Sequence, residues 1–248
     1  MATDIWEPLH RELDRWYKAG KAADFWLRDD DAVSPKPALT QLLDLSERHS
    51  VPMALAVIPE STGQSLAEYL SNWPLATVVV HGWSHTNFAG EGEKKQELGE
   101  HRPIKVVTAE LEAGLNRLQA LHTGRFSPVL VPPWNRIAPP LVELLAGLGF
   151  QALSVFGTEK VGTLPMINTH VDLIDWHGTR GGRDHIALID DIVHRLQVMF
   201  NGGGSMGFLT HHLVHDETAW HFLDTLFDRT ASHPASRWTS LPHILIQV

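Results

Sequence analysis

The sequence contains no cysteine, which excludes disulfide bonds and thiolate metal ligands. Any metal ion must then be held by histidine and carboxylate side chains. Basic residues are also scarce, with 20 Lys and Arg against 29 Asp and Glu, and the formal net charge is -9. This balance argues against binding to nucleic acid or to an anionic membrane, both of which favour basic surfaces.

Long hydrophobic runs are missing as well. Residues 1–15 are rich in Asp, Glu, His and Arg and contain no apolar segment, so we expect neither a secretory signal nor a membrane span. We therefore expect a cytoplasmic protein, and the sequence does not indicate an oligomeric state. The 248 residues include no linker-like stretch, which predicts a single domain over residues 1–248.

Short apolar segments alternate with amphipathic segments along the chain. Strands are expected at 25–28, 53–58, 77–80, 128–131, 152–156, 171–174 and 206–209, and helices at 5–20, 38–49, 64–70, 108–121, 141–148, 186–200 and 216–229. About seven such repeats predict a parallel α/β architecture, either a barrel or a doubly wound sheet. We favour a distorted or incomplete (β/α) barrel, because one barrel face would gather the polar residues that follow the strands: Asp29, His81, Trp134, Asp175 and His211.

Two histidines four residues apart, His81 and His85, follow the strand at 77–80. Two imidazoles suit zinc, cobalt, nickel or iron, and a carboxylate is the usual third ligand. The acidic run Asp29-Asp30-Asp31 follows the strand at 25–28 and could supply it. Each pattern alone has an ordinary explanation, because the chain has 16 His and acidic runs usually mark solvated turns. Their shared position at strand ends predicts a metal site.

Residues 87–103 are rich in Gly, Glu, Lys and Gln. Such a segment at a strand end is either a mobile lid or substrate wall, or a solvated surface loop. The sequence leaves both interpretations open.

The ordered set of motifs resembles that of the polysaccharide deacetylases, the NodB-like carbohydrate esterases of family 4. That family has an acidic pair, an H-x-x-x-H pair, a Pro-Pro-aromatic turn, a D-x-x-D-W segment and a late Leu-x-His. Here these are Asp29-Asp30, His81 with His85, Pro132-Pro133-Trp134, Asp172 to Trp176, and Leu209-Thr210-His211. The resemblance covers most of the chain.

The resemblance implies a role for each matched residue. Asp30, His81 and His85 would bind a divalent metal, with zinc expected and Co²⁺, Ni²⁺ or Fe²⁺ as alternatives. Asp29 would be the general base, and the backbone N–H of Trp134 would stabilise the oxyanion. His211 would be the general acid, oriented and kept cationic by Asp175. Trp176 and Leu209 would line the acetyl pocket.

Two departures from the family pattern bear on this assignment. Val131 stands where the family has an arginine that orients the base, and Arg136 or Arg28 could replace that arginine. The doublet His211-His212 leaves the identity of the acid open. The resemblance implies a metal-dependent hydrolase of amide C–N bonds that deacetylates an N-acetylated sugar or oligosaccharide, so that its substrate would be a small molecule or an oligosaccharide. The alternatives are hydrolysis of a small cyclic amide or imide, and a non-catalytic, metal-containing carbohydrate-binding protein.

Overall fold

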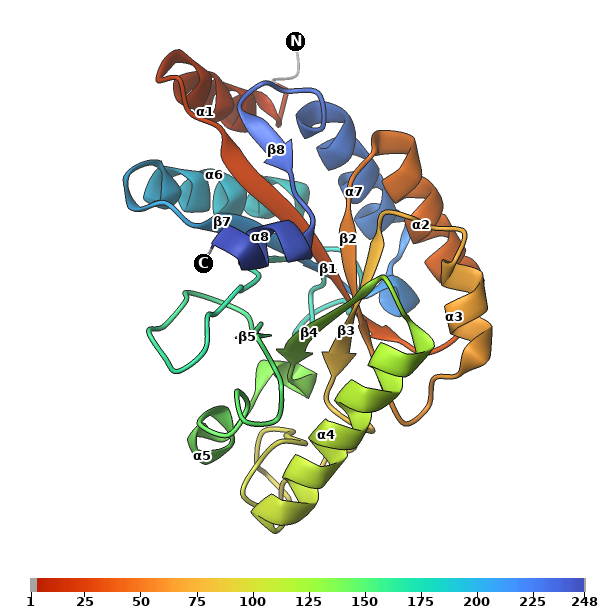
Figure 1. Cartoon of the computed structure of the whole chain (residues 1–248). Helices are drawn as coiled ribbons and strands as arrows, with labels where there is room; N and C mark the ends of the chain where they lie inside the picture. The colour runs from red at the N-terminus through yellow and green to blue at the C-terminus, as the bar shows by residue number, and fades with distance from the viewer. Residues whose placement is uncertain (1–3, 248) are drawn as a thin grey trace.

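A parallel sheet organises the chain, which the computed structural model describes over residues 4–247 (Figure 1). The strands are β1 Ala23–Ala32, β2 Met53–Val57, β3 Ala76–His81, β4 Phe126–Val131, β5 Ala152–Leu153, β6 Val171–Asp172, β7 Ser205–Thr210 and β8 Ser236–Trp238. The helices are α1 Glu7–Lys18, α2 Pro37–His49, α3 Gln64–Leu70, α4 Ile104–Leu121, α5 Pro139–Val142, α6 His185–Gly202, α7 Glu217–Thr230 and α8 Leu241–Gln247. Two short 3-10 helices, η1 Pro133–Asn135 and η2 His212–Val214, follow β4 and β7.

The strand order is β5-β4-β3-β2-β1-β7-β6, and within residues 4–247 every pairing between these strands is parallel. Residues 165–172, which form little regular structure, lie between the two edges of the sheet and bond to both sides. Ile167 donates a backbone hydrogen bond to Leu153 of β5, and His170 donates one to Gly207 of β7. The sheet is therefore a curled, incomplete (β/α) barrel, as the sequence predicts.

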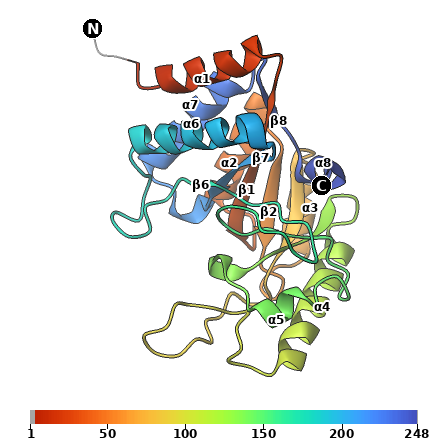
Figure 2. The same ribbon diagram turned by 90° about the vertical axis from the view of Figure 1, so that its left-hand side faces the viewer.

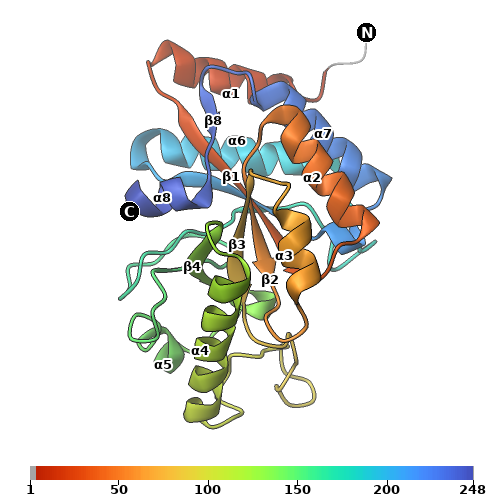
Figure 3. The same ribbon diagram turned by 45° about the vertical axis from the view of Figure 1, so that its right-hand side comes forward.

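Side chains of each strand alternate between the helix-covered outer face and the barrel interior. In β1, Phe25 and Leu27 join the large outer core, whereas Trp26 joins a smaller inner cluster with Ala54, Ala56, Val79 and Val131. The helices α2, α3 and α4 follow one another over the outer face (Figure 3), and α1, α6 and α7 lie together (Figure 2). Leu241 and Ile244 of α8 pack against the inner cluster. The lower part of the interior is thus filled with apolar residues, and polar residues occupy it at the carboxyl ends of the strands.

Several expected boundaries differ from the observed ones. β1 continues to Ala32, so the acidic run lies in the strand rather than after it. α4 begins at Ile104, four residues before the expected Thr108. The helix expected at 141–148 is limited to Pro139–Val142 and continues as turns. Both β8 and α8 are additional elements; β8 is a three-residue strand with two polar residues, which leaves little periodic signal.

Residues 87–103 contain little regular structure but are attached to the body of the protein. Leu98 is fully buried, and its carbonyl accepts a backbone hydrogen bond from Ala138. Glu97 is 1% exposed. Among the described residues, no helix is long and apolar enough to cross a membrane.

Candidate active site

The end of β1 presents alternate residues to opposite faces of the sheet. Because Trp26 faces the barrel interior, Arg28 and Asp30 face the interior too, and Asp29 faces the helices. The neighbouring strand β7 pairs Leu209 with Arg28 and Thr210 with Asp29. His211 therefore follows Leu209 on the interior side, beside Asp30.

Asp31 lies at an irregularity of this strand. The pairing of β1 with β2 shifts register between Asp29 and Ala32, and Asp31 has a positive φ of 74°. Aspartate is one of the few non-glycine residues that adopt this conformation readily. The bulge turns the Asp31 carboxylate toward the two histidines of the H-x-x-x-H pair. Asp31 Oδ1 lies 3.1 Å from His81 Nε2 and 3.3 Å from His85 Nε2.

The donor atoms of Asp31, His81 and His85 all lie within 4.8 Å of one another. The resemblance places Asp30 in this group, but the structure places Asp31 there instead, because the bulge directs the Asp31 side chain to the histidines. His81 Nδ1 is 2.9 Å from the carbonyl of Val131. That hydrogen bond fixes the tautomer and leaves Nε2 free to bind a metal. Two imidazoles and one carboxylate fit a zinc-type ion.

The pKa values of all three residues in this group are shifted. Burial opposes ionisation of Asp31, but hydrogen bonding and the charge of His81 outweigh it and lower the pKa of Asp31. Burial likewise opposes a charged His81, but the negative charge of Asp30 outweighs it and raises the pKa of His81. For His85, burial and the charge of His81 lower the pKa. The shifts of Asp31 and His85 favour the negative carboxylate and the neutral imidazole that a metal requires, whereas the shift of His81 favours a proton that a bound metal would displace.

Asp30 is held by Arg28, which is fully buried. Arg28 Nε lies 2.9 Å from Asp30 Oδ1, and its Nη2 donates to Asp30 Oδ2 at 3.1 Å. The remaining guanidinium donors bond to the hydroxyl of Ser154 at 2.8 Å and to the side-chain carbonyl of Asn135 at 2.7 Å. Arg28 is therefore the arginine that holds Asp30, and it does so from β1. Arg136, the other candidate, instead donates to the carbonyl of Lys95.

His211 lies on the other side of Asp30. Its Nε2 is 3.9 Å from Asp30 Oδ2, and its ring meets that of Trp176 edge-on with centroids 4.7 Å apart. Asp172 accepts hydrogen bonds from the Trp176 indole at 2.8 Å and from the N–H of Ile174 at 2.9 Å. Burial raises the pKa of Asp172, and the charge of His211 acts against that shift.

Asp175, expected beside His211, has a different position. Its carboxylate accepts the backbone N–H groups of Gly178 and Thr179, so it caps the turn that follows β6. The acidic residue of this segment that influences His211 is therefore Asp172. The D-x-x-D-W pattern offers two aspartates, and only the tertiary structure separates them.

Asp29, expected as the general base, is fully buried on the outer side of the sheet. It accepts hydrogen bonds from Thr210 Oγ1 at 2.7 Å, the His212 N–H at 2.9 Å and His212 Nδ1 at 2.5 Å. Burial raises the pKa of Asp29, but the charge of His212 outweighs it and the net shift is downward. This pair joins the ends of β1 and β7 and is separated from the candidate metal group by the plane of the sheet.

The other expected residues lie around the same barrel mouth. Trp134 has a φ of 54°, and its ring centroid is 4.4 Å from that of His85. Trp176 is 39% exposed, whereas Leu209 is 1% exposed and lies beneath His211 on the interior face. Positive φ values at Asp31, His85 and Trp134 place three unusual backbone conformations at one site.

Glu97 is a site residue that the sequence does not reveal. Its carboxylate accepts the backbone N–H groups of Trp83, Ser84 and His85. Burial raises its pKa, and these hydrogen bonds act against the shift. A glutamate inside a segment rich in Glu and Lys carries no local signal of such a role.

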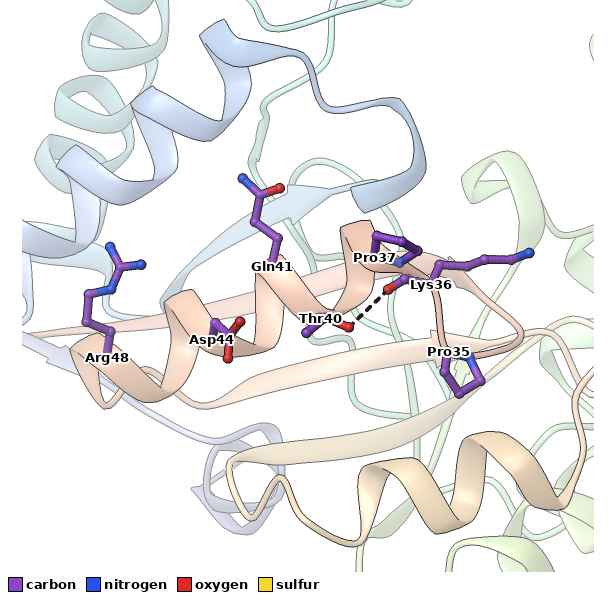
Figure 4. A pocket seen from close by; sticks show the side chains of 7 residues that line it. All are labelled: Pro35, Lys36, Pro37, Thr40, Gln41, Asp44 and Arg48. Atoms are coloured by element: carbon purple, nitrogen blue, oxygen red, sulfur yellow. Dashed lines mark hydrogen bonds between the residues drawn. The ribbon is translucent and has the colours of Figure 1, made fainter.

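A shallow surface hollow of about 610 Å³ lies along α2, apart from these residues (Figure 4). It is lined by Pro35, Lys36, Pro37, Thr40, Gln41, Asp44 and Arg48. Two of these residues are hydrogen-bonded to each other: Thr40 Oγ1 donates to the carbonyl of Lys36 at 3.3 Å (Figure 4). The candidate metal group contributes no residue to this lining, so the hollow is not part of the active site.

No protein-family model and no curated protein sequence matches the chain. Solved structures do match it. A Mycobacterium smegmatis protein assigned as a polysaccharide deacetylase superposes with a TM-score of 0.71 at 15% identity, over 92% of this chain and 91% of the other. A peptidoglycan N-acetylglucosamine deacetylase superposes with a TM-score of 0.60 at 16% identity, over 90% and 87%.

A third match is a mutated pseudoenzyme of carbohydrate esterase family 4 with restored enzymatic activity. It superposes with a TM-score of 0.62 at 14% identity, over 90% of this chain and 68% of the other. Identities this low establish the fold and leave the reaction to the residues of the site. This chain has the NodB-like barrel fold of the polysaccharide deacetylases.

Proposed function

We propose that the protein is a metal-dependent hydrolase that removes acetyl groups from an N-acetylated sugar. The observation that carries this proposal is one constellation at the barrel mouth. The donor group of Asp31, His81 and His85 adjoins a carboxylate, Asp30, and an imidazole, His211. The deacetylases among the structural matches support the same reaction class.

In this proposal Asp31, His81 and His85 would hold a divalent metal, with zinc as the expected ion, and that metal would supply Lewis acidity at the acetyl carbonyl and at the attacking water. Asp30, held by Arg28, is the general base that takes a proton from the attacking water. The backbone N–H of Trp134 is the proposed oxyanion donor. His211, supported by Asp172, donates a proton to the amine nitrogen as the C–N bond breaks. Acetate and a free amine are the products.

These assignments revise the roles that the resemblance implies. Asp30 takes the role of base in place of Asp29, and Asp31 takes the role of metal ligand in place of Asp30. Asp172 supports the acid in place of Asp175. The revised pair keeps two adjacent carboxylates, Asp31 that would hold the metal and Asp30 that would take the proton from the attacking water. Trp176 and Leu209 remain the proposed walls of the acetyl pocket.

The direct test is acetate release from N-acetylated chitooligosaccharides and from a panel of small linear and cyclic amides, with zinc- or cobalt-loaded protein. We expect release from the acetylated sugars and loss of that activity in the His85→Ala variant. Hydrolysis confined to cyclic amides would replace the proposed substrate. Saccharide binding without turnover would favour the non-catalytic alternative, for which the pseudoenzyme among the matches is a precedent.

Replacing Asp172 should affect the acid step in particular. Asp172→Asn removes the carboxylate next to His211, and a neighbouring carboxylate favours the protonated imidazole. We expect kcat to fall by about 10- to 100-fold, which is less than the roughly 10² to 10⁴ of a residue that itself transfers the proton, because Asp172 acts through His211. The measurement is the rate of acetate release at saturating substrate. The control is Asp175→Asn, and an equal fall in kcat in that variant would contradict the assignment of Asp172.

A further inference from the structure

Glu97 offers a single buried carboxylate to a run of backbone donors. The N–H of Ser84 donates to Oε1 at 2.7 Å, that of Trp83 to Oε1 at 3.2 Å and that of His85 to Oε2 at 3.2 Å. The Ser84 hydroxyl also donates to Oε1 at 3.2 Å. These donors lie in the turn between His81 and His85, so Glu97 holds the stretch of backbone that separates the two candidate ligands.

The turn is shaped around this carboxylate. Gly82 has a φ of +58°, and a Cβ at that position would lie 2.3 Å from Glu97 Oε2 and 2.7 Å from Pro133. His85 itself has a φ of 57°, which is unfavourable for a residue with a side chain. The hydrogen bond to its N–H helps to offset that cost. Without Glu97, the turn loses the partner that keeps the His85 imidazole facing His81.

Glu97 is itself fixed from the framework. Its neighbour Leu98 is buried and pairs with Ile137, near the Pro-Pro-aromatic turn. Arg102 donates to both carboxylate oxygens of Glu110 in α4 at 2.8 Å. The 87–103 segment therefore links the turn between the two histidines to Ile137 and to α4.

We infer that Glu97 is a positioning residue for the candidate metal centre: it sets the turn that presents His85 opposite His81 and Asp31. This inference rests on the proposed function, because it presumes that the three residues bind a metal. It also gives the 87–103 segment a function, which is to carry the carboxylate that preorganises the site. Residues that orient metal ligands typically contribute 10- to 100-fold to metal affinity.

The test uses two substitutions that separate position from charge. Glu97→Asp keeps the negative charge but shortens the side chain, so the carboxylate no longer reaches all three N–H groups. Glu97→Gln keeps the length but replaces one acceptor oxygen by a donor. Glu93→Gln, in the same segment at an exposed residue that bonds to Gly90 and His101, is the matched control.

Zinc affinity is measured by competition with a chromogenic chelator, and the coordination geometry by the visible absorption of the cobalt-loaded protein. We expect Glu97→Asp and Glu97→Gln each to lower zinc affinity by about 10- to 100-fold and to alter the cobalt spectrum. Glu93→Gln should change neither. If Glu97→Asp binds zinc as tightly as the unsubstituted protein with the same cobalt spectrum, the positioning role is overturned.

The unsubstituted protein and His85→Ala are measured alongside. Failure of the unsubstituted protein to bind zinc or cobalt would overturn the proposed function, and with it this inference. Tight binding that depends on His85 but not on Glu97 would overturn the inference alone. Circular dichroism of each metal-free variant shows whether the protein is folded, and the aspartate variant, which keeps the charge, covers the case in which the glutamine variant does not fold.

Discussion

Replacing Asp31 with asparagine should abolish metal binding, whereas replacing Asp30 with asparagine should leave metal binding intact and reduce turnover. The expectation follows from the bulge in β1, which directs the Asp31 carboxylate to His81 and His85. The Asp30 carboxylate instead forms an ion pair with Arg28. A lost ligand should cost more than the roughly 10- to 100-fold in affinity that a supporting residue contributes. A lost general base should lower kcat by about 10² to 10⁴.

Both quantities can be measured on the same preparations. Zinc affinity comes from chelator competition, and kcat from acetate release at saturating zinc. Asp29→Asn completes the series, because the sequence resemblance names Asp29 as the base. If Asp30→Asn loses the metal while Asp31→Asn retains it, the ligand assignment from the structure is wrong.

The buried pair of Asp29 and His212 should be among the largest contributors to stability. Both side chains are at most 1% exposed, and Asp29 accepts three hydrogen bonds from Thr210 and His212. Asp29→Asn leaves a buried histidine without its counter-charge, which should lower the free energy of unfolding by about 3–5 kcal/mol. The measurement is urea denaturation of the metal-free protein at pH 6.

A second aspartate–histidine pair provides a matched control. His49 and Asp224 lie 2.8 Å apart on α2 and α7, but the Asp224 side chain is 45% exposed. Asp224→Asn should therefore cost only about 0–1 kcal/mol. Equal destabilisation by Asp29→Asn and Asp224→Asn would show that burial does not strengthen the Asp29 pair.

The contribution of the buried pair should also depend on pH. The pKa of Asp29 lies below its ordinary value of 3.8, and that of His212 lies above its ordinary value of 6.5, since each charge favours the other despite burial. The stabilisation is thus fully present between about pH 4 and 6.5. It decreases as pH falls through the lowered pKa of Asp29 and as pH rises through the raised pKa of His212. The difference in unfolding free energy between Asp29→Asn and the unsubstituted protein should follow the same profile.

The sequence predicts the architecture well because periodicity and composition are local properties. Apolar runs such as Met53–Val57 identify strands buried on both faces, and their alternation with helices predicts a parallel barrel. Asp216, the first residue of the helix expected at 216–229, is the N-cap of α7, since its side chain accepts the N–H of Ala219. Short elements such as β8 are not predicted, because three residues carry almost no periodic signal.

The sequence by itself determined that any metal centre must use histidine and carboxylate, and it placed the H-x-x-x-H pair and the acidic run near the carboxyl ends of two strands. Only the tertiary structure decided which acid of Asp29-Asp30-Asp31 faces which partner. Adjacent strand residues point to opposite faces, and a one-residue bulge changes that alternation. The same holds for Arg28 and Glu97. Arg28 bonds to Ser154 and Asn135, and Glu97 bonds to the 83–85 turn, and only folding brings these separate segments together.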